Sequence, residues 1–313
     1  MIWLIGSGPM SVDYAKVLDG LNKEYTVIGR GQVSADKFSN QTGKRVVTGG
    51  LELFIKSGVS VPEAAIISVG VTQLYDTALK LIEIGVKNIL VEKPAAVSYQ
   101  QIEDLCARCD THNCNIFVAY NRRFLSSVIE AKKRIEEDGG PTSFNFELTE
   151  WAHVIGKIHK PVDELKKWFL ANSTHVADLA FFLGGKPKEL SCFTAGSLEW
   201  HPDSSIFAGS GVSNTGALFN YGANWESAGR WSVEILTKEH RYIFRPMEQL
   251  QVQKKGQIAI NSVEVDVSLD KEYKPGLYKQ VKEFLSEDYG NLCSIQEQKK
   301  QFKFFEQMAG YTF

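Results

Sequence analysis

The chain has 313 residues, 43% hydrophobic and 23% charged, a composition typical of globular domains. Its 35 Lys and Arg residues nearly balance 37 Asp and Glu residues, so the formal net charge is −2, which argues against nucleic acid or an anionic membrane as the main partner. No apolar run approaches the roughly 20 residues of a membrane span. The opening residues, MIWLIG, predict a strand instead of a signal peptide. We therefore expect a cytoplasmic protein without nucleic-acid or membrane partners.

The first 120 residues alternate strands and helices. Strands are predicted at Ile2–Ile5, Tyr25–Ile28, Arg45–Val47, Ala64–Val69, Asn88–Val91 and Asn115–Ala119. Helices are predicted at Met10–Leu21, Val33–Asn40, Leu51–Ser57, Leu74–Ile84 and Tyr99–Asp110. This alternation, with apolar and β-branched strands, predicts an α/β domain: a doubly wound parallel sheet of the Rossmann type. Such sheets bind dinucleotides outside the carboxyl ends of their strands.

The pattern changes after Tyr120, so we expect domains at 1–120 and 121–313. Helices are predicted at Ser126–Glu137, Ser173–Leu183, Gly276–Ser286 and Ile295–Ala309, and a strand at Ser143–Glu150. The segments 218–237 (LFNYGANWESAGRWSVEILT) and 241–256 (RYIFRPMEQLQVQKKG) alternate polar and apolar residues and predict hairpin strands. The second domain is therefore expected to be α+β with a mostly antiparallel sheet.

The turn after the first strand is Gly6-Ser7-Gly8-Pro9-Met10-Ser11. Gly6 allows a tight turn, and Gly8 lets a pyrophosphate approach the backbone at a helix N-terminus. Ser11 stands where this motif usually has Gly or Ala. Because the turn lies between a strand and a helix, it meets the structural condition of a dinucleotide motif.

The end of the second strand usually distinguishes NAD from NADP. Here the sequence Val27-Ile28-Gly29-Arg30-Gly31 has no acid to hold the ribose 2′-hydroxyl. Arg30 can pair with a 2′-phosphate, and Ser34 can add a hydroxyl. The alternative is a solvated arginine on a surface turn. We favour NADP, with NAD as the alternative.

Glu92 and Lys93 follow the fifth strand, and Pro94 restricts the backbone of Lys93. One interpretation is an exposed ion pair of little energetic value. The other is a lysine in the cofactor cleft that hydrogen-bonds a substrate oxygen or exchanges a proton with it.

His175 and Asp178 are three residues apart on a predicted helix, which Asn172 or Ser173 can cap. A histidine in a first helical turn is favoured as the neutral ring, a usable general base. The alternative is a structural histidine bonded to Asp178.

Five cysteines, an odd number, favour reduced thiols. Cys106, Cys109, His112 and Cys114 have spacings that resemble a metal cluster. Structural zinc usually needs a second, distant ligand pair, and none stands out. We expect no metal site.

Together these features resemble the glucose–fructose oxidoreductase and inositol dehydrogenase family, often written Gfo/Idh/MocA. The resemblance covers essentially the whole chain and rests on LIGSGPMSVDYA, ISVGVTQLYDTALKLIEIGVKNILVEKPAAVS, AYNRRF, NSTHVADLAFFLGG and EYKPGLYKQVKEFL. The motifs Glu-Lys-Pro, Asn-Arg-Arg-Phe and His-x-x-Asp, found in this order, are more specific for the family than any one of these motifs alone.

The resemblance implies a nicotinamide-dependent oxidoreductase whose C-terminal domain, built on an open sheet, supplies the substrate site and often the oligomer interface. It implies that Lys93 and His175 are catalytic and that the Lys93–Pro94 bond is often cis. Asn121 and Arg122 match residues near the nicotinamide and substrate. The turn under the cofactor is matched by Val69, Gly70, Val71 and Gln73.

One position departs from the family. Many members have Asp four residues before the histidine, where this chain has Ala171. Either His175 works with Lys93 alone, or Asn172 or Thr174 orients the substrate, or redox chemistry is lost. The segment Trp151–Lys160 can line a sugar site or form a solvated loop.

We predict an NAD(P)-dependent oxidoreductase that transfers a hydride between nicotinamide and a hydroxyl or keto carbon of a sugar, sugar derivative or polyol. The alternative is a non-catalytic NAD(P)-binding sensor or accessory protein. A homodimer or homotetramer through the C-terminal sheet is expected. The predicted cofactor contacts are Gly6, Gly8, Pro9, Met10, Arg30, Ser34, Val69, Gly70, Val71, Gln73, Glu92, Lys93 and Asn121. The predicted substrate contacts are Lys93, Arg122, Trp151, His153, Asn172, Thr174 and His175.

Overall fold

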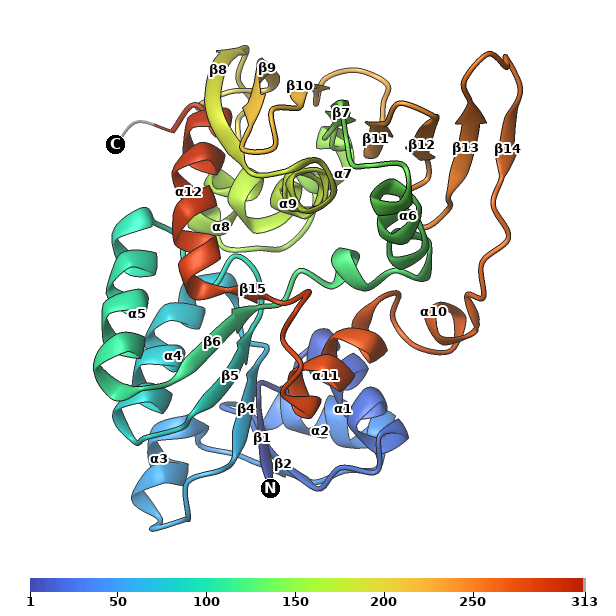
Figure 1. Ribbon diagram of the computed structural model, residues 1–313. Coiled ribbons are helices and arrows are strands. Elements are labelled where there is room, and N and C mark those ends of the chain that lie inside the picture. The colour runs from blue at the N-terminus through green and yellow to red at the C-terminus, as the bar shows by residue number, and fades with distance from the viewer. Residues whose placement is uncertain (312–313) are drawn as a thin grey trace. The chain divides into compact units, whose positions relative to one another are not determined.

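The computed structural model describes residues 1–311 and divides into two compact units (Figure 1). Residues 1–121 and 269–299 form the first unit, and residues 122–268 with those from 300 onward form the second. The sequence predicted two continuous segments, whereas each compact unit contains two segments of the chain. Among the described residues, no helix is both long enough and apolar enough to span a membrane.

The first unit contains a seven-stranded sheet with strand order β15-β6-β5-β4-β1-β2-β3. Its strands are β1 (Ile2–Ile5), β2 (Tyr25–Ile28), β3 (Val46–Val47), β4 (Ala64–Ile67), β5 (Asn88–Val91), β6 (Asn115–Val118) and β15 (Cys293–Ser294). β1 to β6 are parallel, and all residues of β1 and β4 are buried, as expected for strands covered on both faces. The predicted Rossmann-type sheet is confirmed. The antiparallel edge strand β15 was not predicted, because two residues carry no readable strand pattern.

Helices flank this sheet on both faces, with α1, α2 and α11 on one side and α3, α4 and α5 on the other (Figure 1). Their bounds are α1 (Pro9–Gly20), α2 (Gln32–Thr42), α3 (Gly50–Lys56), η1 (Val71–Gln73), α4 (Leu74–Glu83), α5 (Tyr99–His112) and α11 (Leu277–Ser286). The predicted ends differ from these by at most two residues. In α5, for example, Ser98 accepts a hydrogen bond from the Gln101 amide, and Asn113 ends the helix in the left-handed conformation.

The second unit contains an eight-stranded sheet with strand order β14-β13-β12-β11-β7-β10-β9-β8. Its strands are β7 (Ser143–Glu147), β8 (Pro187–Ala195), β9 (Ile206–Ser213), β10 (Leu218–Asn224), β11 (Ser232–Leu236), β12 (His240–Phe244), β13 (Gln251–Lys254) and β14 (Ile260–Ser262). β7 and β10 are parallel, and the other neighbours are antiparallel. The mostly antiparallel C-terminal sheet is therefore confirmed.

One predicted hairpin is wrong. Residues 241–256 supply the paired strands β12 and β13, as predicted, but β10 and β11 within residues 218–237 do not pair with each other. β7 lies between them, parallel to β10 and antiparallel to β11. The connection Trp225–Trp231 therefore crosses the end of β7. Its length allows this crossing, and the alternation of side chains cannot reveal which strand occupies the gap.

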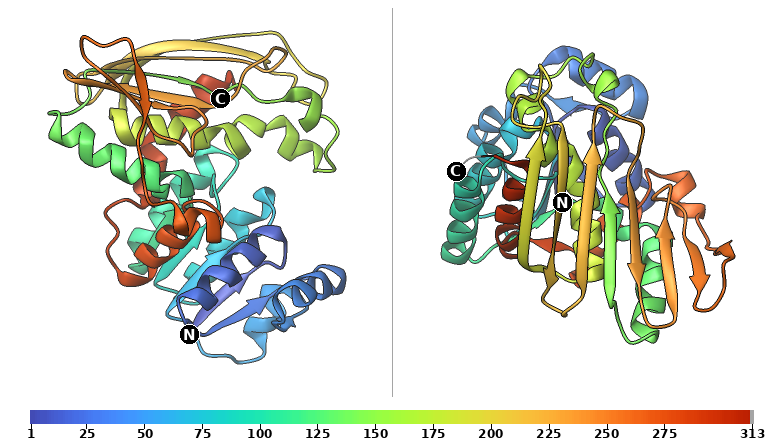
Figure 2. Two further views of the ribbon diagram at one scale, coloured as in Figure 1. Left: turned by 90° about the vertical axis from the view of Figure 1, so that its right-hand side faces the viewer. Right: turned by 90° about the horizontal axis from the view of Figure 1, so that it is seen from above.

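Helix α9 packs on one face of this sheet and contacts β7 and β11. The helices of this part of the chain are α6 (Ser126–Glu137), α7 (Ala152–Ile155), α8 (Val162–Lys166), the π-helical η3 (Phe169–Ser173) and α9 (Thr174–Gly184). Phe181 of α9 lies 5.6 Å, ring centre to ring centre, from Phe146 and 5.4 Å from Phe219. The opposite face, turned to the viewer in the right panel of Figure 2, carries no helix among the described residues.

Three helical elements lie at or beside the chain positions where one unit ends and the other begins. They are η2 (Asn121–Phe124), α10 (Ser268–Glu272) and α12 (Ile295–Ala309). α12 matches its predicted bounds, whereas α7, α8 and α10 were not predicted because each has only four or five residues.

Candidate active site

The glycine turn between β1 and α1 combines a strained position with an open one. Gly6 has a φ of +121°, and a Cβ atom there would lie 2.4 Å from the Ser68 carbonyl oxygen. Gly8 precedes the first turn of α1, and a Cβ atom there would meet no protein atom within 4 Å. Pro9 and Met10 open the helix, where Pro costs no hydrogen bond. The turn therefore exposes backbone N–H groups at a helix N-terminus, a favourable site for a phosphate.

Ser11 occupies the third position of the motif and is fully buried. Its hydroxyl lies 2.7 Å from the Ser68 hydroxyl, which in turn donates to the Ile5 carbonyl oxygen at 3.4 Å. This hydrogen bond satisfies a buried polar group, so serine is accommodated where glycine or alanine is usual.

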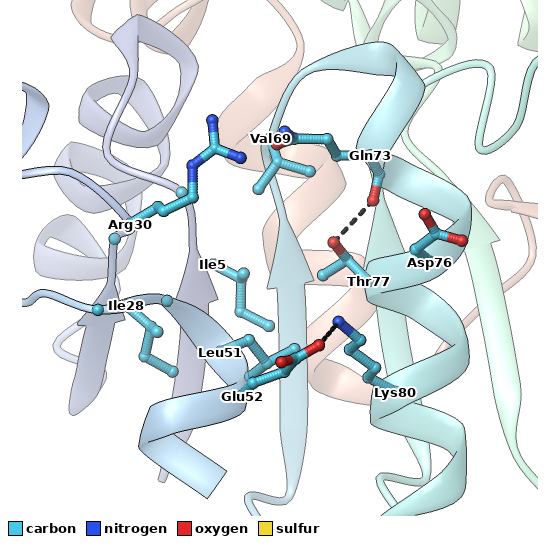
Figure 3. A pocket seen from close by; sticks show the side chains of 14 residues that line it. Ile5, Ile28, Arg30, Leu51, Glu52, Val69, Gln73, Asp76, Thr77 and Lys80 are labelled. Carbon is cyan, nitrogen blue, oxygen red and sulfur yellow. Dashed lines mark hydrogen bonds and ion pairs between the residues drawn. The ribbon is translucent and has the colours of Figure 1, made fainter.

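A pocket of 360 Å³ opens beside this turn at the carboxyl ends of the parallel strands (Figure 3). It is lined by Ile5, Gly6, Ile28, Gly29, Arg30, Gly49, Gly50, Leu51, Glu52, Val69, Gln73, Asp76, Thr77 and Lys80. Four of the predicted cofactor residues, Gly6, Arg30, Val69 and Gln73, thus lie around one pocket. Gly70 precedes η1 and Val71 is its first residue, directly beside these lining residues in the sequence.

Arg30 follows the end of β2, and its exposed side chain is one of those that line the pocket (Figure 3). Across the pocket, Lys80 of α4 forms an ion pair with Glu52 of α3, which lowers the pKa of the Glu52 carboxyl. Ser34 is not among the residues that line the pocket. Its hydroxyl accepts a hydrogen bond from Ser7 at 2.9 Å and donates to the Gly31 carbonyl oxygen at 3.0 Å. Ser34 therefore supports the glycine turn from α2.

Glu92 and Lys93 follow β5, and the Glu92 amide continues the strand pairing by donating to Ile67. The Glu92 carboxylate accepts a 2.7 Å hydrogen bond from the buried Tyr14 hydroxyl of α1. Burial raises the pKa of Glu92, and the nearby Lys93 opposes that shift. The side chain of Glu92 thus links the middle of α1 to the turn that carries Lys93.

The turn after Lys93 is held from the C-terminal segment of the same unit. The Lys93–Pro94 bond is cis, and the Pro94 carbonyl oxygen accepts a 3.0 Å hydrogen bond from the Gln298 amide. Asn121 is buried, and its side-chain amide donates to the Pro275 carbonyl oxygen at 2.9 Å. Segment 269–299 therefore fixes two of the turns that were predicted to contact cofactor.

In the second unit, the prediction that Asn172 or Ser173 caps the histidine-bearing helix is wrong. The π-helical turn η3 runs directly into α9, so Ser173 has helical backbone angles and its side chain makes no capping bond. Both side chains instead donate to Oε1 of the buried Glu150, at 2.9 Å from Asn172 and 2.8 Å from Ser173. Because helical structure begins at Phe169, His175 lies beyond the first turn, and the helix-dipole argument for its neutral form weakens.

His175 is partly exposed, and its ring centre lies 6.2 Å from that of Trp231. Thr174 is fully buried, and its hydroxyl donates to the Leu170 carbonyl oxygen at 2.8 Å. Asp178 is also fully buried and accepts two hydrogen bonds from Arg123, at 2.8 and 2.5 Å, and one from Gln301 at 3.0 Å. The Asn-Arg-Arg-Phe and His-x-x-Asp motifs are thus joined by a buried ion pair.

The other predicted substrate residues lie in or beside short helical elements of the second unit. Arg122 donates to Glu248 at 2.9 Å. Trp151 is 48% exposed, and its indole N–H donates to the Gly229 carbonyl oxygen at 3.2 Å. His153 is exposed on α7.

Sequence reasoning missed several residues of both sites. In the pocket these are Glu52, Asp76, Thr77 and Lys80, and in the second unit they are Glu150, Arg230 and Trp231. The Gly49-Gly50 pair at the start of α3 was an available signal, because both residues have positive φ and line the pocket. Glu150 offered no such signal in the sequence, because Asn172, Ser173 and Arg230, which contact its carboxylate, are 22 or more residues away.

The cysteines near the end of α5 are free thiols. Cys114 donates to the Cys109 sulfur at 3.2 Å, and the Cys106 thiol contacts the Ile295 carbonyl oxygen at 3.3 Å. Burial raises the pKa of Cys106 to about 11, so that thiol stays protonated at neutral pH.

Comparison with known proteins adds to this geometry. Residues 2–120 match the GFO_IDH_MocA family model, described as an oxidoreductase family with an NAD-binding Rossmann fold. A search of curated protein sequences found no match. Among solved structures, levoglucosan dehydrogenase in complex with NADH aligns with a TM-score of 0.81 at 17% identity, covering 99% of this chain and 96% of that one.

Two further structures align over nearly the whole chain. UDP-N-acetylglucosamine 3-dehydrogenase from Acidithiobacillus ferrooxidans has a TM-score of 0.78 at 13% identity, covering 99% of this chain and 97% of that one. A putative NADPH-dependent oxidoreductase from Desulfitobacterium hafniense has a TM-score of 0.79 at 14% identity, with coverages of 98% and 94%. At these identities the alignments establish a shared fold across both units. The family match covers residues 2–120, so over that segment the chain is similar to the NAD-binding Rossmann domain of the Gfo/Idh/MocA oxidoreductases, as the sequence resemblance implied.

Proposed function

We propose that this protein is an NAD(P)-dependent dehydrogenase or reductase that acts on a hydroxyl or keto carbon of a sugar, sugar derivative or polyol. The observation that carries this proposal is a convergence at the carboxyl ends of β1, β2, β4 and β5. The open glycine turn, the 360 Å³ pocket and Lys93 all follow these strand ends. Ligands of doubly wound sheets bind at this edge. Two of the similar structures are named as sugar dehydrogenases, which supports a sugar-like substrate.

The residues present suit a dinucleotide. Gly8 leaves space at the N-terminus of α1 for a diphosphate, and the pocket beyond Gly6 can hold the adenosine end. When bound, the nicotinamide accepts or supplies the hydride. In the oxidative direction, His175 takes the proton of the substrate hydroxyl, and the Lys93 ammonium hydrogen-bonds the same oxygen. That bond lowers the energy of the alkoxide-like state as negative charge develops on the oxygen.

Fluorescence titration with NADH and NADPH, followed by a panel of sugars, keto-sugars and polyols, tests this function. Lys93→Met and His175→Gln should each lower turnover by roughly 10²- to 10⁴-fold, the usual contribution of acid–base groups. Lys133→Met, on the exposed face of α6, and His112→Gln, on α5, are matched controls that should retain activity. An unchanged rate in either test variant removes that residue from the mechanism.

NADP(H) is the cofactor we favour, with NAD(H) as the alternative. Arg30 lies at the position where an acid would otherwise hold the ribose hydroxyls, and its guanidinium matches a phosphate. Glu52 and Asp76 also line this pocket, and their negative charges favour the NAD(H) alternative. Arg30→Ala should weaken NADPH about tenfold or more while changing NADH little, because it removes a charge-assisted hydrogen bond. Equal effects on both cofactors would contradict this role.

The second candidate function is a cofactor-binding sensor or accessory protein without turnover. Ala171, which is buried at the position where many family members have Asp, favours it. Tight binding of NADH or NADPH without oxidation or reduction of any panel compound is the result this candidate predicts.

We also propose that two or more copies associate through the helix-free face of the eight-stranded sheet. Phe193, Ile206 and Leu218 share this face according to the strand register and are 70%, 37% and 62% exposed. Exposed apolar side chains gathered on one face are typical of an interaction surface. Phe193→Glu with Leu218→Glu should convert a dimer or tetramer to smaller species in light scattering. An unchanged mass would show that this face is not the interface.

A further inference from the structure

Arg230 has an unusual setting in the loop between β10 and β11. Its guanidinium carbon lies 4.7 Å from the ring centre of Trp151 and 4.7 Å from that of Trp231. The side chain is nevertheless 46% exposed. A cation close to the faces of two indole rings is restrained in position, because each ring face attracts it electrostatically. Arg230 is therefore an ordered charge that remains accessible to a ligand.

The backbone around Arg230 is fixed as well. Its amide donates to Oε1 of Glu147 at 3.2 Å, and Trp151 donates to the preceding Gly229 carbonyl oxygen at 3.2 Å. A Cβ atom at Gly229 would lie 2.3 Å from the same Glu147 oxygen, so glycine allows the close approach of this loop to β7. The loop thus holds the arginine in place before any ligand arrives.

The hydrogen-bond donors of this guanidinium are available. The acid nearest to it is Glu150, whose Oε2 lies 3.6 Å from Nη1, beyond hydrogen-bond distance. The other carboxylate oxygen of Glu150 accepts from Asn172 and Ser173. Within residues 1–311, the Arg230 side chain donates no hydrogen bond. Glu150 therefore balances the charge of the arginine without occupying its five N–H groups.

This available arginine lies next to the predicted catalytic histidine. Trp231 contacts Arg230 on its ring face, and its ring centre lies 6.2 Å from that of His175. The fixed donors of Arg230 and the predicted proton acceptor therefore lie beside the same indole ring. This shared neighbour brings Arg230 close enough to His175 to be considered for the same candidate site.

We propose that Arg230 anchors an oxyanion of the substrate, so that the site takes an acidic sugar bearing a carboxylate or a phosphate. The planar guanidinium fork matches two oxygens of either group and gains charge-assisted hydrogen bonds from both. A neutral hydroxyl matches only one donor and gains less. This inference deepens the proposed function and rests on it for calling the ligand a substrate, while the anchor itself is a binding property.

Calorimetric titration of the full chain without cofactor tests the anchor. The probes are D-glucuronate, D-glucose 6-phosphate and neutral D-glucose. Wild-type protein should bind at least one acidic probe ten or more times more tightly than glucose, and the stronger probe distinguishes carboxylate from phosphate. R230Q should lose this preference, weakening the acidic probe by roughly ten- to one-hundred-fold, the range for hydrogen bonds to charged groups. R230K keeps the charge but not the fork and should bind at an intermediate level.

R241Q is the matched control, since Arg241 is a similarly exposed arginine of β12 that pairs with Glu234. It should keep the wild-type preference. Equal affinity for glucose and both acidic probes, no binding of either acidic probe, or an unchanged preference in R230Q would each overturn the proposal. If R230Q does not fold, R230K and the wild-type comparison still decide. The titration measures binding and requires no turnover, so its outcome is independent of whether the proposed enzymatic function is correct.

Discussion

The glycine turn of the first unit and the π-helical turn that precedes His175 in the second both bring polar groups to a candidate site, by different means. The glycine turn uses backbone N–H groups and a conformation that only glycine adopts readily. The turn before His175 uses side chains that meet on one buried carboxylate, Glu150. The first arrangement is local in the sequence and the second is not. A backbone site can therefore be recognised from a motif, whereas a side-chain network appears only after folding.

The largest effect is expected from the buried ion pair that supports α9. Asp178→Ala leaves the Arg123 guanidinium buried without its acid and should lower the free energy of unfolding by about 3–5 kcal/mol. Chemical denaturation followed by circular dichroism measures this. The double variant Arg123→Met with Asp178→Leu should recover much of the loss, because it removes the uncompensated charge. A loss below about 1 kcal/mol for the single variant would mean that the pair does not stabilise the second unit.

Substitutions at Gly6 and Gly8 should have different effects, one on the stability of the fold and the other on cofactor binding. Gly6→Ala places a Cβ 2.4 Å from the Ser68 oxygen at positive φ, so we expect a loss of about 2–4 kcal/mol of stability. Gly8→Val meets no protein atom at its Cβ and should change stability little, yet it should weaken NADH and NADPH strongly by occupying the phosphate position. Thermal melts and cofactor titration of both variants distinguish the two effects. Normal cofactor affinity in a folded Gly8→Val protein would exclude this turn as the phosphate site.

Removing the carboxylate of Glu150 should lower stability without changing cofactor affinity, unlike the substitution at Gly8. Glu150→Ala leaves the Asn172 and Ser173 donors without their acceptor and should cost about 1–3 kcal/mol. It should leave NADH and NADPH affinity unchanged, because the predicted cofactor pocket lies wholly in the first unit. Glu234→Ala, on the neighbouring strand β11, is the control for a partly exposed carboxylate and should cost less. If Glu150→Ala and Glu234→Ala are equally stable, the hydrogen bonds to Glu150 contribute little.

The weakest expected effect is a pH dependence of stability that arises from His201 in the second unit. Burial lowers the pKa of His201, whose ring nitrogens contact the Ser204 carbonyl oxygen at 2.6 Å and the Tyr311 hydroxyl at 2.8 Å. The unfolded chain then binds a proton more readily than the folded one. Stability should therefore be full above the ordinary histidine pKa of about 6.5 and fall as pH decreases below it.

Denaturation at pH 7.5 and 5.5 checks this dependence. His201→Gln should show a smaller loss between the two values than wild type, whereas His153→Gln, with its exposed side chain, should keep the wild-type loss. An identical pH dependence in His201→Gln would exclude His201 as its source.

Local periodicity and backbone restriction were enough to predict the parallel sheet, the glycine turn, the strand end that carries Lys93 and the helix that carries His175. The hydrogen bond that the Ser34 hydroxyl accepts from Ser7 could not be read from the sequence, and the predicted contact of Ser34 with a cofactor stays a prediction.

The folded structure was needed to establish the order of the strands around β7, the role of residues 269–299 in the first unit, and the meeting of Glu150, Arg230 and Trp231 near His175. Contacts between residues far apart in the chain depend on which surfaces pack together. Local hydrophobic pattern specifies that a face is buried, but it does not specify the partner of each buried polar group.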